Sequence, residues 1–260
     1  MIESAHVIGM GRLGRHWADR LESLDISVDR WSRHASAGVH AMENWPEAEP
    51  AQAIFLAVPD REIGSVADQV RSKASADTVL VHHAGAVSID VLPVEADRRV
   101  VMWPPMTFIR ESAPDWASMP LGVESTQPRW LELARKIAPQ AFSLTAESRP
   151  ILHMGAVLAG NLSASWLGIV ESFLEQHDLP LAVLRPLVIE SVKLALEGRA
   201  LDTVSGPASR NDTDTLKRQC SRLEGGDADL ALLHRILTNR ILHHHGHNGL
   251  PSIQATPRQY

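Results

Sequence analysis

Three glycines near the start of the chain have the spacing of a phosphate-binding turn. They follow the apolar pair Val7 and Ile8 and precede residues with helical periodicity. In this pattern the first glycine permits a tight turn, the second lets a pyrophosphate approach the main chain, and the third lets a helix pack closely on a strand. The alternative is a glycine turn without a ligand. We expect dinucleotide contacts from Gly9, Met10, Gly11, Arg12, Leu13 and Gly14.

The end of the next expected strand indicates which dinucleotide is bound. An acid about 20 residues after the glycines would bind the ribose 2′-hydroxyl of NAD. The strand expected over residues 26–31 is instead followed by Ser32 and Arg33. A hydroxyl and a guanidinium suit a 2′-phosphate, so NADP(H) is favoured over NAD(H). Asp29 is expected inside the strand, and a different register there would favour NAD.

Two polar residues in the second half of the chain are candidates for catalysis. His153 and Asn161 are eight residues apart in a stretch with helical periodicity, so they lie roughly on one face, two turns apart. Hydride transfer to a carbonyl needs a proton donor for the developing alkoxide, and imidazole titrates near neutral pH. The alternative is a structural role for both, with His153 bonded at a domain junction and Asn161 capping a loop.

Arg210 follows Gly206-Pro207 at the expected start of a helix, where a guanidinium could bind a substrate carboxylate. An ion pair with Asp212 is the alternative, and Asp212 could also cap that helix. Thr107 and His82 lie in loops after expected strands and are candidates for contact with the substrate. His82 could instead be a buried strand-end histidine, and neighbouring His83 should point to the opposite side.

The first half of the chain alternates strand-like and helical runs, which predicts an α/β fold with a mainly parallel, Rossmann-type sheet. Ligands bind beyond the carboxyl ends of such strands. Three loops therefore matter, at residues 59–60, 82–85 and 103–108. Val58, Pro59 and Asp60 are expected as further cofactor contacts. We expect strands at residues 6–8, 26–31, 53–58, 78–82, 99–102, 121–124 and 142–144, and helices at 13–24, 61–73, 89–95 and 128–137.

The second half lacks strand-like runs and has long amphipathic stretches. These predict a smaller, all-α C-terminal domain. The expected organisation is a cofactor domain over residues 1–146, a helical substrate and dimerisation domain over 147–250, and a loose tail over 251–260. The expected helices cover residues 151–177, 181–197, 209–223 and 227–244.

Composition and charge argue against several classes of partner and site. The net charge is −6, and no basic run suggests nucleic acid or an anionic membrane as a partner. The single cysteine, Cys220, argues for a reducing cytoplasm, and no uninterrupted apolar run reaches transmembrane length. Four histidines at residues 243–245 and 247 have no accompanying acid or cysteine, and adjacent histidines do not converge readily on one ion, so no metal site is expected.

The order of the motifs resembles one family, which joins a Rossmann-like domain to a helical domain of unknown function numbered 2520. The resemblance spans nearly the whole chain. Its most distinctive parts are His-x-x-Ala followed by Asn161, and Gly-Pro-x-x-Arg-x-Asp before Thr215. The matching segments are residues 7–14, 31–33, 57–60, 82–85, 104–108, 153–161 and 206–212.

The family is similar to the wider 6-phosphogluconate-dehydrogenase-like superfamily, which also holds ketopantoate, pyrroline-carboxylate and prephenate enzymes. The resemblance implies that His153 replaces a lysine that polarises the carbonyl. It also implies a homodimer formed through residues 151–174 and 181–196. This chain departs from the family pattern at Ala84, Met106 and Asn211, where serine, glutamine and glycine are common. These departures bear on the substrate more than on the cofactor.

The sequence therefore predicts an NADP(H)-dependent oxidoreductase that reduces a small 2-oxo acid, ketopantoate first, to the 2-hydroxy acid. The nearest alternatives are an imine reductase of the pyrroline-carboxylate type and a prephenate-type dehydrogenase. An alternative of another class is a non-catalytic NADP-binding sensor or assembly partner.

Overall fold

The computed structural model describes residues 2–108, 113–224 and 226–250. Its contacts divide the chain into two compact units, residues 1–162 and residues 163–260. The division falls inside the first helix expected for the second domain, residues 151–177, and so lies later than the 146–147 boundary inferred from the sequence. The expected tail, residues 251–260, lies outside the described residues.

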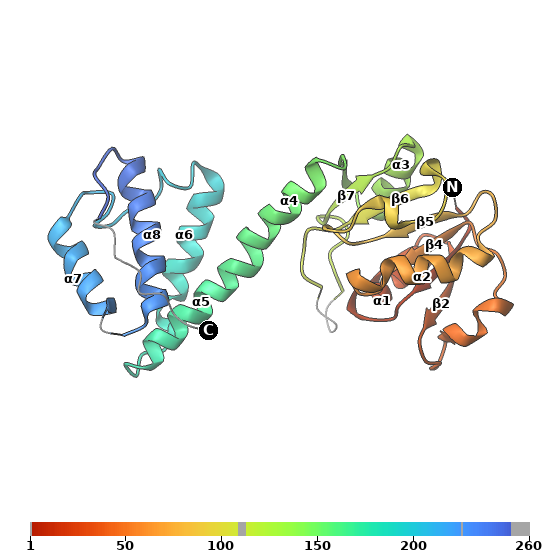
Figure 1. The fold of residues 1–260 in the computed structure, drawn as a ribbon, viewed down its shortest axis with the longest axis horizontal. Coiled ribbons are helices and arrows are strands. Elements are labelled where there is room, and N and C mark those ends of the chain that lie inside the picture. Colours follow the sequence, from red (N-terminus) through yellow and green to blue (C-terminus); the bar gives the residue numbers. More distant parts are fainter. Residues whose placement is uncertain (1, 109–112, 225, 251–260) are drawn as a thin grey trace. The chain divides into compact units, whose positions relative to one another are not determined.

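The first unit is built on an eight-stranded sheet in the order β3-β2-β1-β4-β5-β6-β7-β8 (Figure 1). All neighbouring strands are parallel except β6 and β7, which pair antiparallel. This arrangement confirms the predicted α/β fold with a mainly parallel sheet. The strands are β1 (Ser4–Ile8), β2 (Ser27–Ser32), β3 (His40–Ala41), β4 (Ala53–Leu56), β5 (Val79–His82), β6 (Arg99–Trp103), β7 (Pro120–Glu124) and β8 (Gln140–Ser143).

Alternation along the central strands sends apolar side chains to both faces of the sheet, as expected for strands covered on both sides. Ala53 and Phe55 of β4 face the cluster that includes residues of α1 and α3, whereas Ile54 and Leu56 face the cluster around α2. The covering helices are α1 (Arg12–Glu22), α2 (Ile63–Val70) and α3 (Pro128–Ile137). Burial on both faces makes this sheet a rigid support for the loops at its carboxyl ends.

One predicted helix is wrong. Residues 89–95 form only a short 3₁₀ turn, Ile89–Val91, capped by the Ser88 hydroxyl, which accepts from the Asp90 N–H. Pro93 has no N–H and disfavours helical backbone at Leu92, so the turn cannot extend.

A helix of 28 residues, Ser148–Glu175, follows the sheet. It consists of α4 (Ser148–Ala156), a π-helical turn (Val157–Asn161) and α5 (Leu162–Glu175). By length and composition alone it is apolar enough to cross a membrane, contrary to the expectation that no segment reaches that length. The sequence argument counted uninterrupted apolar runs, whereas this helix is apolar on average. Length and composition do not distinguish a span from a helix whose apolar face is covered by protein.

The described part of the second unit is helical, as predicted. Its other helices are α6 (Arg185–Glu197), α7 (Thr213–Glu224) and α8 (Ala228–His244). Asp227 caps α8 by accepting from the N–H groups of Asp229 and Leu230. A small core of Ala208, Leu216 and Leu242 joins α7 and α8. Several large apolar side chains of α6 stay exposed in the single chain, as does Leu162 at the start of α5.

Candidate functional site

The predicted dinucleotide turn joins β1 to α1, with each glycine in a distinct environment. Gly9 has φ +100°, and a β-carbon there would lie 2.5 Å from the Ala57 carbonyl oxygen. A β-carbon on Gly14 would lie 1.8 Å from the Gly9 carbonyl oxygen, so only glycine permits this approach of helix and turn. Gly11 has open space around its Cα. The turn is therefore tightly packed at Gly9 and Gly14 and open at Gly11. This is the shape that a bound pyrophosphate requires.

The first turn of α1 has N–H groups free for an anion. Gly11 occupies the N-cap position and supplies no side-chain cap. The first N–H groups of a helix lack internal partners and attract phosphate. Arg12 begins the helix and is exposed, while Leu13 packs into the core beneath it. The Met10 carbonyl accepts from Arg15 Nε at 3.1 Å, which fixes the loop between them.

The end of β2 has the register that the sequence predicts. Asp29 pairs with His6 in the middle of the strand, and its carboxylate lies 3.5 Å from His6 Nδ1. Ser32 is the last residue of β2, and exposed Arg33 follows it. Because β1 and β2 are adjacent and parallel, Ser32 and Arg33 lie at the same edge of the sheet as the glycine turn. Asp29 lies in the middle of β2 and not at that edge. It is therefore not placed as the acid that would favour NAD.

The loop after β4 completes this edge. The Ala57 N–H donates to the Ile8 carbonyl at 2.8 Å, and a β-carbon on Gly9 would meet Val58 Cγ1 at 3.1 Å. Pro59 precedes a 3₁₀ turn that begins at Asp60. Strand order therefore brings all three predicted cofactor segments, residues 9–14, 32–33 and 58–60, to the carboxyl ends of neighbouring strands.

A hollow of about 180 Å³ in the first unit brings together three predicted substrate-site residues. They are His153 of α4, Asn161 at the end of the π-helical turn, and Thr107 of the loop after β6. The walls also include Trp103, Pro105, Met106, Ala156, Val157 and Gly160. Trp103 packs with its ring centroid 5.5 Å from that of His153 in an edge arrangement.

The π-helical turn aligns His153 with Asn161. Eight residues of regular α-helix would leave the two side chains roughly 80° apart around the axis. A π turn spans more residues per turn, so the residue at its end rotates by less. Both residues then line one hollow. Turns of this kind inside α-helices occur frequently at functional sites.

His82 does not join this site. It is fully buried, and its Nδ1 accepts from the Ala84 N–H at 3.2 Å. Burial, the neighbouring His83 and the charge of Arg149 lower the pKa of His82 to about 3. In this structure His82 is a neutral imidazole that supports the loop after β5, and the substrate role predicted for it stays a prediction.

His83 points to the opposite face, as predicted. Its ring stacks on Trp17 at 4.3 Å between centroids, and its Nδ1 is 2.8 Å from the Met102 carbonyl oxygen. Burial lowers the pKa of His83 to about 4. Like His82, it is a neutral residue of the interior.

Arg210 lies in the second unit and is not among the residues that line the hollow. It is exposed and precedes Asn211, whose φ of +56° is the left-handed conformation that a glycine would adopt easily. Asp212 caps α7 by accepting from the Thr215 N–H at 3.1 Å, as expected. Hydrogen bonds to Thr215 keep the pKa of the Asp212 carboxyl below its usual range.

The histidines near the end of α8 have structural contacts. His244 pairs with Asp202, and His247 Nε2 lies 3.2 Å from the Ser209 carbonyl oxygen. Among the described residues, no group of three or more histidine, cysteine or acidic side chains could hold a metal ion.

The sequence analysis missed Arg149 and Glu124. Arg149 Nε donates to Glu124 Oε2 at 2.6 Å, and Nη1 donates to the carbonyls of Ala84 and Gly85 at 3.2 and 2.7 Å. Both charged side chains are buried. Nothing local in the sequence signals a pair between a strand end and a helix start 25 residues later.

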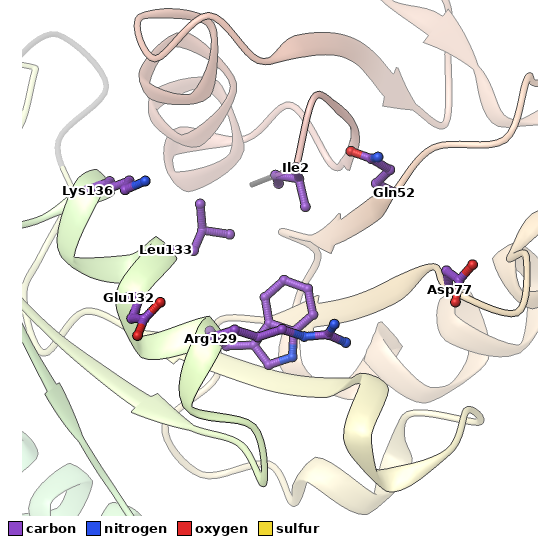
Figure 2. Close-up of a pocket in the computed structure, with 8 residues that line it drawn as sticks. Ile2, Gln52, Asp77, Arg129, Glu132, Leu133 and Lys136 are labelled. Carbon is purple, nitrogen blue, oxygen red and sulfur yellow. The ribbon is translucent and has the colours of Figure 1, made fainter.

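A second hollow, about 310 Å³, lies at the amino edge of the sheet (Figure 2). Ile2, Gln52 and Asp77 precede β1, β4 and β5, and α3 supplies the other wall. Figure 2 shows charged side chains of both signs around Ile2 and Leu133. Parallel sheets bind ligands at the opposite edge, and none of the predicted site residues lies here, so the candidate site is the carboxyl edge.

Comparison with known proteins agrees with this architecture. Residues 120–241, just under half of the chain, match the model described as a domain of unknown function, DUF2520. No curated protein matches the sequence.

Three solved structures resemble the chain. A Bacteroides fragilis protein provisionally described as an NADP oxidoreductase shares 20% identity over 93% of this chain and 98% of its own, with a TM-score of 0.77. A Thermotoga maritima protein shares 21% identity over 92% and 98%, with a TM-score of 0.74. An Aspergillus terreus imine reductase, in complex with NADPH4 and a dibenzazepine, shares 13% identity over 95% and 96%, with a TM-score of 0.62. These likenesses confirm the fold.

Proposed function

We propose that the protein is an NADP(H)-dependent oxidoreductase acting on a small carbonyl or imine bound beside His153. The observation that carries this proposal is the hollow in which His153, Asn161 and Thr107 meet, in the same unit as a phosphate-binding turn. Two of the similar structures are described as an NADP oxidoreductase and as an imine reductase in complex with NADPH4.

The residues at the carboxyl edge fit NADP(H). Gly9 and Gly14 leave no room for side chains, Gly11 leaves its backbone open, and α1 begins without a side-chain cap. Ser32 and Arg33 would hold the 2′-phosphate through a hydroxyl and a guanidinium. Val58, Pro59 and Asp60 would border the dinucleotide on the side of β4. NADPH would supply a hydride when bound.

The side chains of the hollow supply the rest of the chemistry. His153 would donate a proton to the substrate oxygen or nitrogen as negative charge develops there. Asn161 would orient the same atom by hydrogen bonding, and Thr107 would add a donor from the opposite wall. Trp103 and Met106 would exclude water from one side of the substrate.

The first substrate we propose is a 2-oxo acid, with ketopantoate the leading case. An imine is the second candidate, because the residues that line the hollow include no lysine or arginine. An imine without a carboxylate would need no such cation.

We further propose a cytoplasmic homodimer. Apolar side chains of α6 are widely exposed in the single chain, among them Leu187, Ile189, Val192 and Leu196. Contiguous exposed apolar surface of this kind marks protein interfaces. A second copy would cover α5 and α6.

Cofactor binding followed by turnover tests the function. Energy transfer from the seven tryptophans to bound nicotinamide reports NADPH and NADH in separate titrations. Oxidation of NADPH is then followed with ketopantoate and with 1-pyrroline-2-carboxylate. Binding of NADPH with turnover of either substrate supports the enzyme. NADPH binding without turnover of these or related oxo acids and imines supports the sensor, and binding of neither nucleotide overturns both.

A further inference from the structure

Arg149 joins three segments of the first unit with one buried side chain. Its guanidinium contacts Glu124 at the end of β7 and the carbonyls of Ala84 and Gly85 in the loop after β5. It is itself the second residue of α4. Only 2% of its side chain is exposed, and only 8% of that of Glu124. Arginine is almost never buried so completely without a partner, and the side-chain hydrogen bonds described for Arg149 all go to Glu124 and to the 84–85 loop.

Stability alone does not account for this pair. Removing two charges from water is expensive, and apolar replacements of buried ion pairs are often as stable or more stable. A guanidinium instead provides hydrogen bonds of fixed geometry, because its donors lie in one plane and reach several acceptors at set angles. The contacts of Arg149 use that property by bonding a carboxylate and two main-chain carbonyls at once.

Arg149 fixes the position of His153. His153 lies one turn further along α4, on the same face as Arg149. Its ring lies against Gly85, where a β-carbon would be 2.3 Å from His153 Cδ2. The carbonyl of that same Gly85 receives the shorter of the two main-chain hydrogen bonds from Arg149. Arg149 thus holds both the helix that carries His153 and the loop against which His153 packs.

We propose that Arg149 is a positioning residue for the proton donor His153, with Glu124 orienting the Arg149 guanidinium. This inference rests on the proposed function. The pair sets the spacing between α4 and the 84–85 loop, and so the depth at which the His153 ring enters the hollow. A misplacement of about 1 Å at a reacting group reduces rates by as much as about 100-fold.

Two variants separate positioning from stability. Arg149→Lys keeps the charge but cannot reach the carboxylate and both carbonyls together. The double variant Arg149→Met with Glu124→Leu replaces the pair by apolar side chains and should fold even if the lysine variant does not. Arg99→Lys is the matched control, because Arg99 also joins an acid, Asp90, to a main-chain carbonyl, that of Val94, at the far end of β6.

Three measurements are made on each folded variant of the full chain: NADPH affinity, kcat with the substrate that the wild type turns over, and the ¹³C-labelled ring resonance of His153. The resonance is assigned by its loss in His153→Gln. We expect NADPH affinity within about 2-fold of wild type, a shifted His153 resonance, and kcat reduced roughly 10- to 100-fold. Arg99→Lys should match the wild type in all three.

An unchanged His153 resonance together with unchanged kcat in a folded variant overturns the inference, whatever happens to the melting temperature. If the wild type binds no NADPH, the proposed function fails, yet the His153 resonance still decides whether Arg149 places that ring. A resonance that moves equally in Arg99→Lys also overturns it, because the effect is then not specific to this pair.

Discussion

The ring of His153 lies directly against Gly85, with no space between them for a side chain. A β-carbon on Gly85 would be 2.3 Å from His153 Cδ2 and 2.8 Å from Trp103 Cε2. Gly85→Ala should therefore push the ring of His153 out of place and reduce kcat roughly 10- to 100-fold. The control is Gly64→Ala in α2, where an added β-carbon would meet open space and the change should be neutral or slightly stabilising. Equal kcat in the two variants contradicts the prediction.

Replacing His153 itself separates an enzyme from a sensor. His153→Gln should lower kcat by about 100-fold or more, since general acid catalysis contributes about 10²- to 10⁴-fold. NADPH affinity should be retained, because the glycine turn lies on another element. His177→Gln is the control, an exposed histidine whose described ring contact is with Phe173. If His153→Gln keeps full turnover, His153 is structural and the proton donor lies elsewhere.

The sequence predicted most of the sheet and helices because their signals are local. Strand-like apolar runs located the strands, and Pro128 stands at the first position of α3, where proline is favoured. The glycine turn could also be predicted, because the role of each glycine depends on the turn and the helix start next to it in the sequence. The helix predicted over residues 89–95 was wrong. The prediction rested on the apolar residues in that window and gave too little weight to Pro93, which prevents the helix.

The candidate site was harder to predict because it depends on long-range packing. The alternation of side chains along a strand showed that His82 and His83 face opposite sides of the sheet. It did not show that both faces of the sheet are buried there. The eight-residue spacing suggested that His153 and Asn161 share a face, yet a π turn was needed to align them. The contact of Arg149 with Glu124 joins a helix start to a strand end, and only the fold reveals it.

The two buried histidines make stability depend on pH. The folded-state pKa values, about 3 for His82 and about 4 for His83, lie below the unfolded value of 6.5. The unfolded chain then binds protons that the native chain does not, so stability is present above pH 6.5 and falls as the pH drops toward 4. Each group changes the free energy of unfolding by up to about 1.4 kcal/mol per pH unit in that window.

Urea unfolding at pH 7, 6 and 5 measures this dependence. His83→Phe should flatten the slope between pH 6 and 5, because its replacement does not titrate. His177→Gln should leave the slope unchanged. A slope that is the same in wild type and His83→Phe contradicts the assignment of His83 as a neutral buried group.

Arg33 should set the preference for NADPH over NADH. Its guanidinium follows the last residue of β2 and is exposed at the edge that carries the glycine turn. A hydrogen bond to a charged group contributes about 1.5–3 kcal/mol, so Arg33→Ala should weaken NADPH binding roughly 10- to 100-fold and leave NADH binding unchanged. Arg98→Ala, at the residue just before β6 on the amino edge, is the control. Equal losses for both nucleotides would show that Arg33 acts on the fold or on the shared part of the cofactor.

Exposed apolar residues of α6 should form the subunit interface. Val192 and Leu196 are 55% and 83% exposed in the single chain, and both line a surface hollow of about 580 Å³. Val192→Asp with Leu196→Asp should convert a dimer to a monomer in light scattering at micromolar concentration, because an unpaired carboxylate resists burial in an apolar interface. Lys217→Asp, exposed on α7, adds the same side chain outside this surface and should leave the dimer intact. A monomeric wild type removes the homodimer, and a dimer that survives the double substitution places the interface on another face.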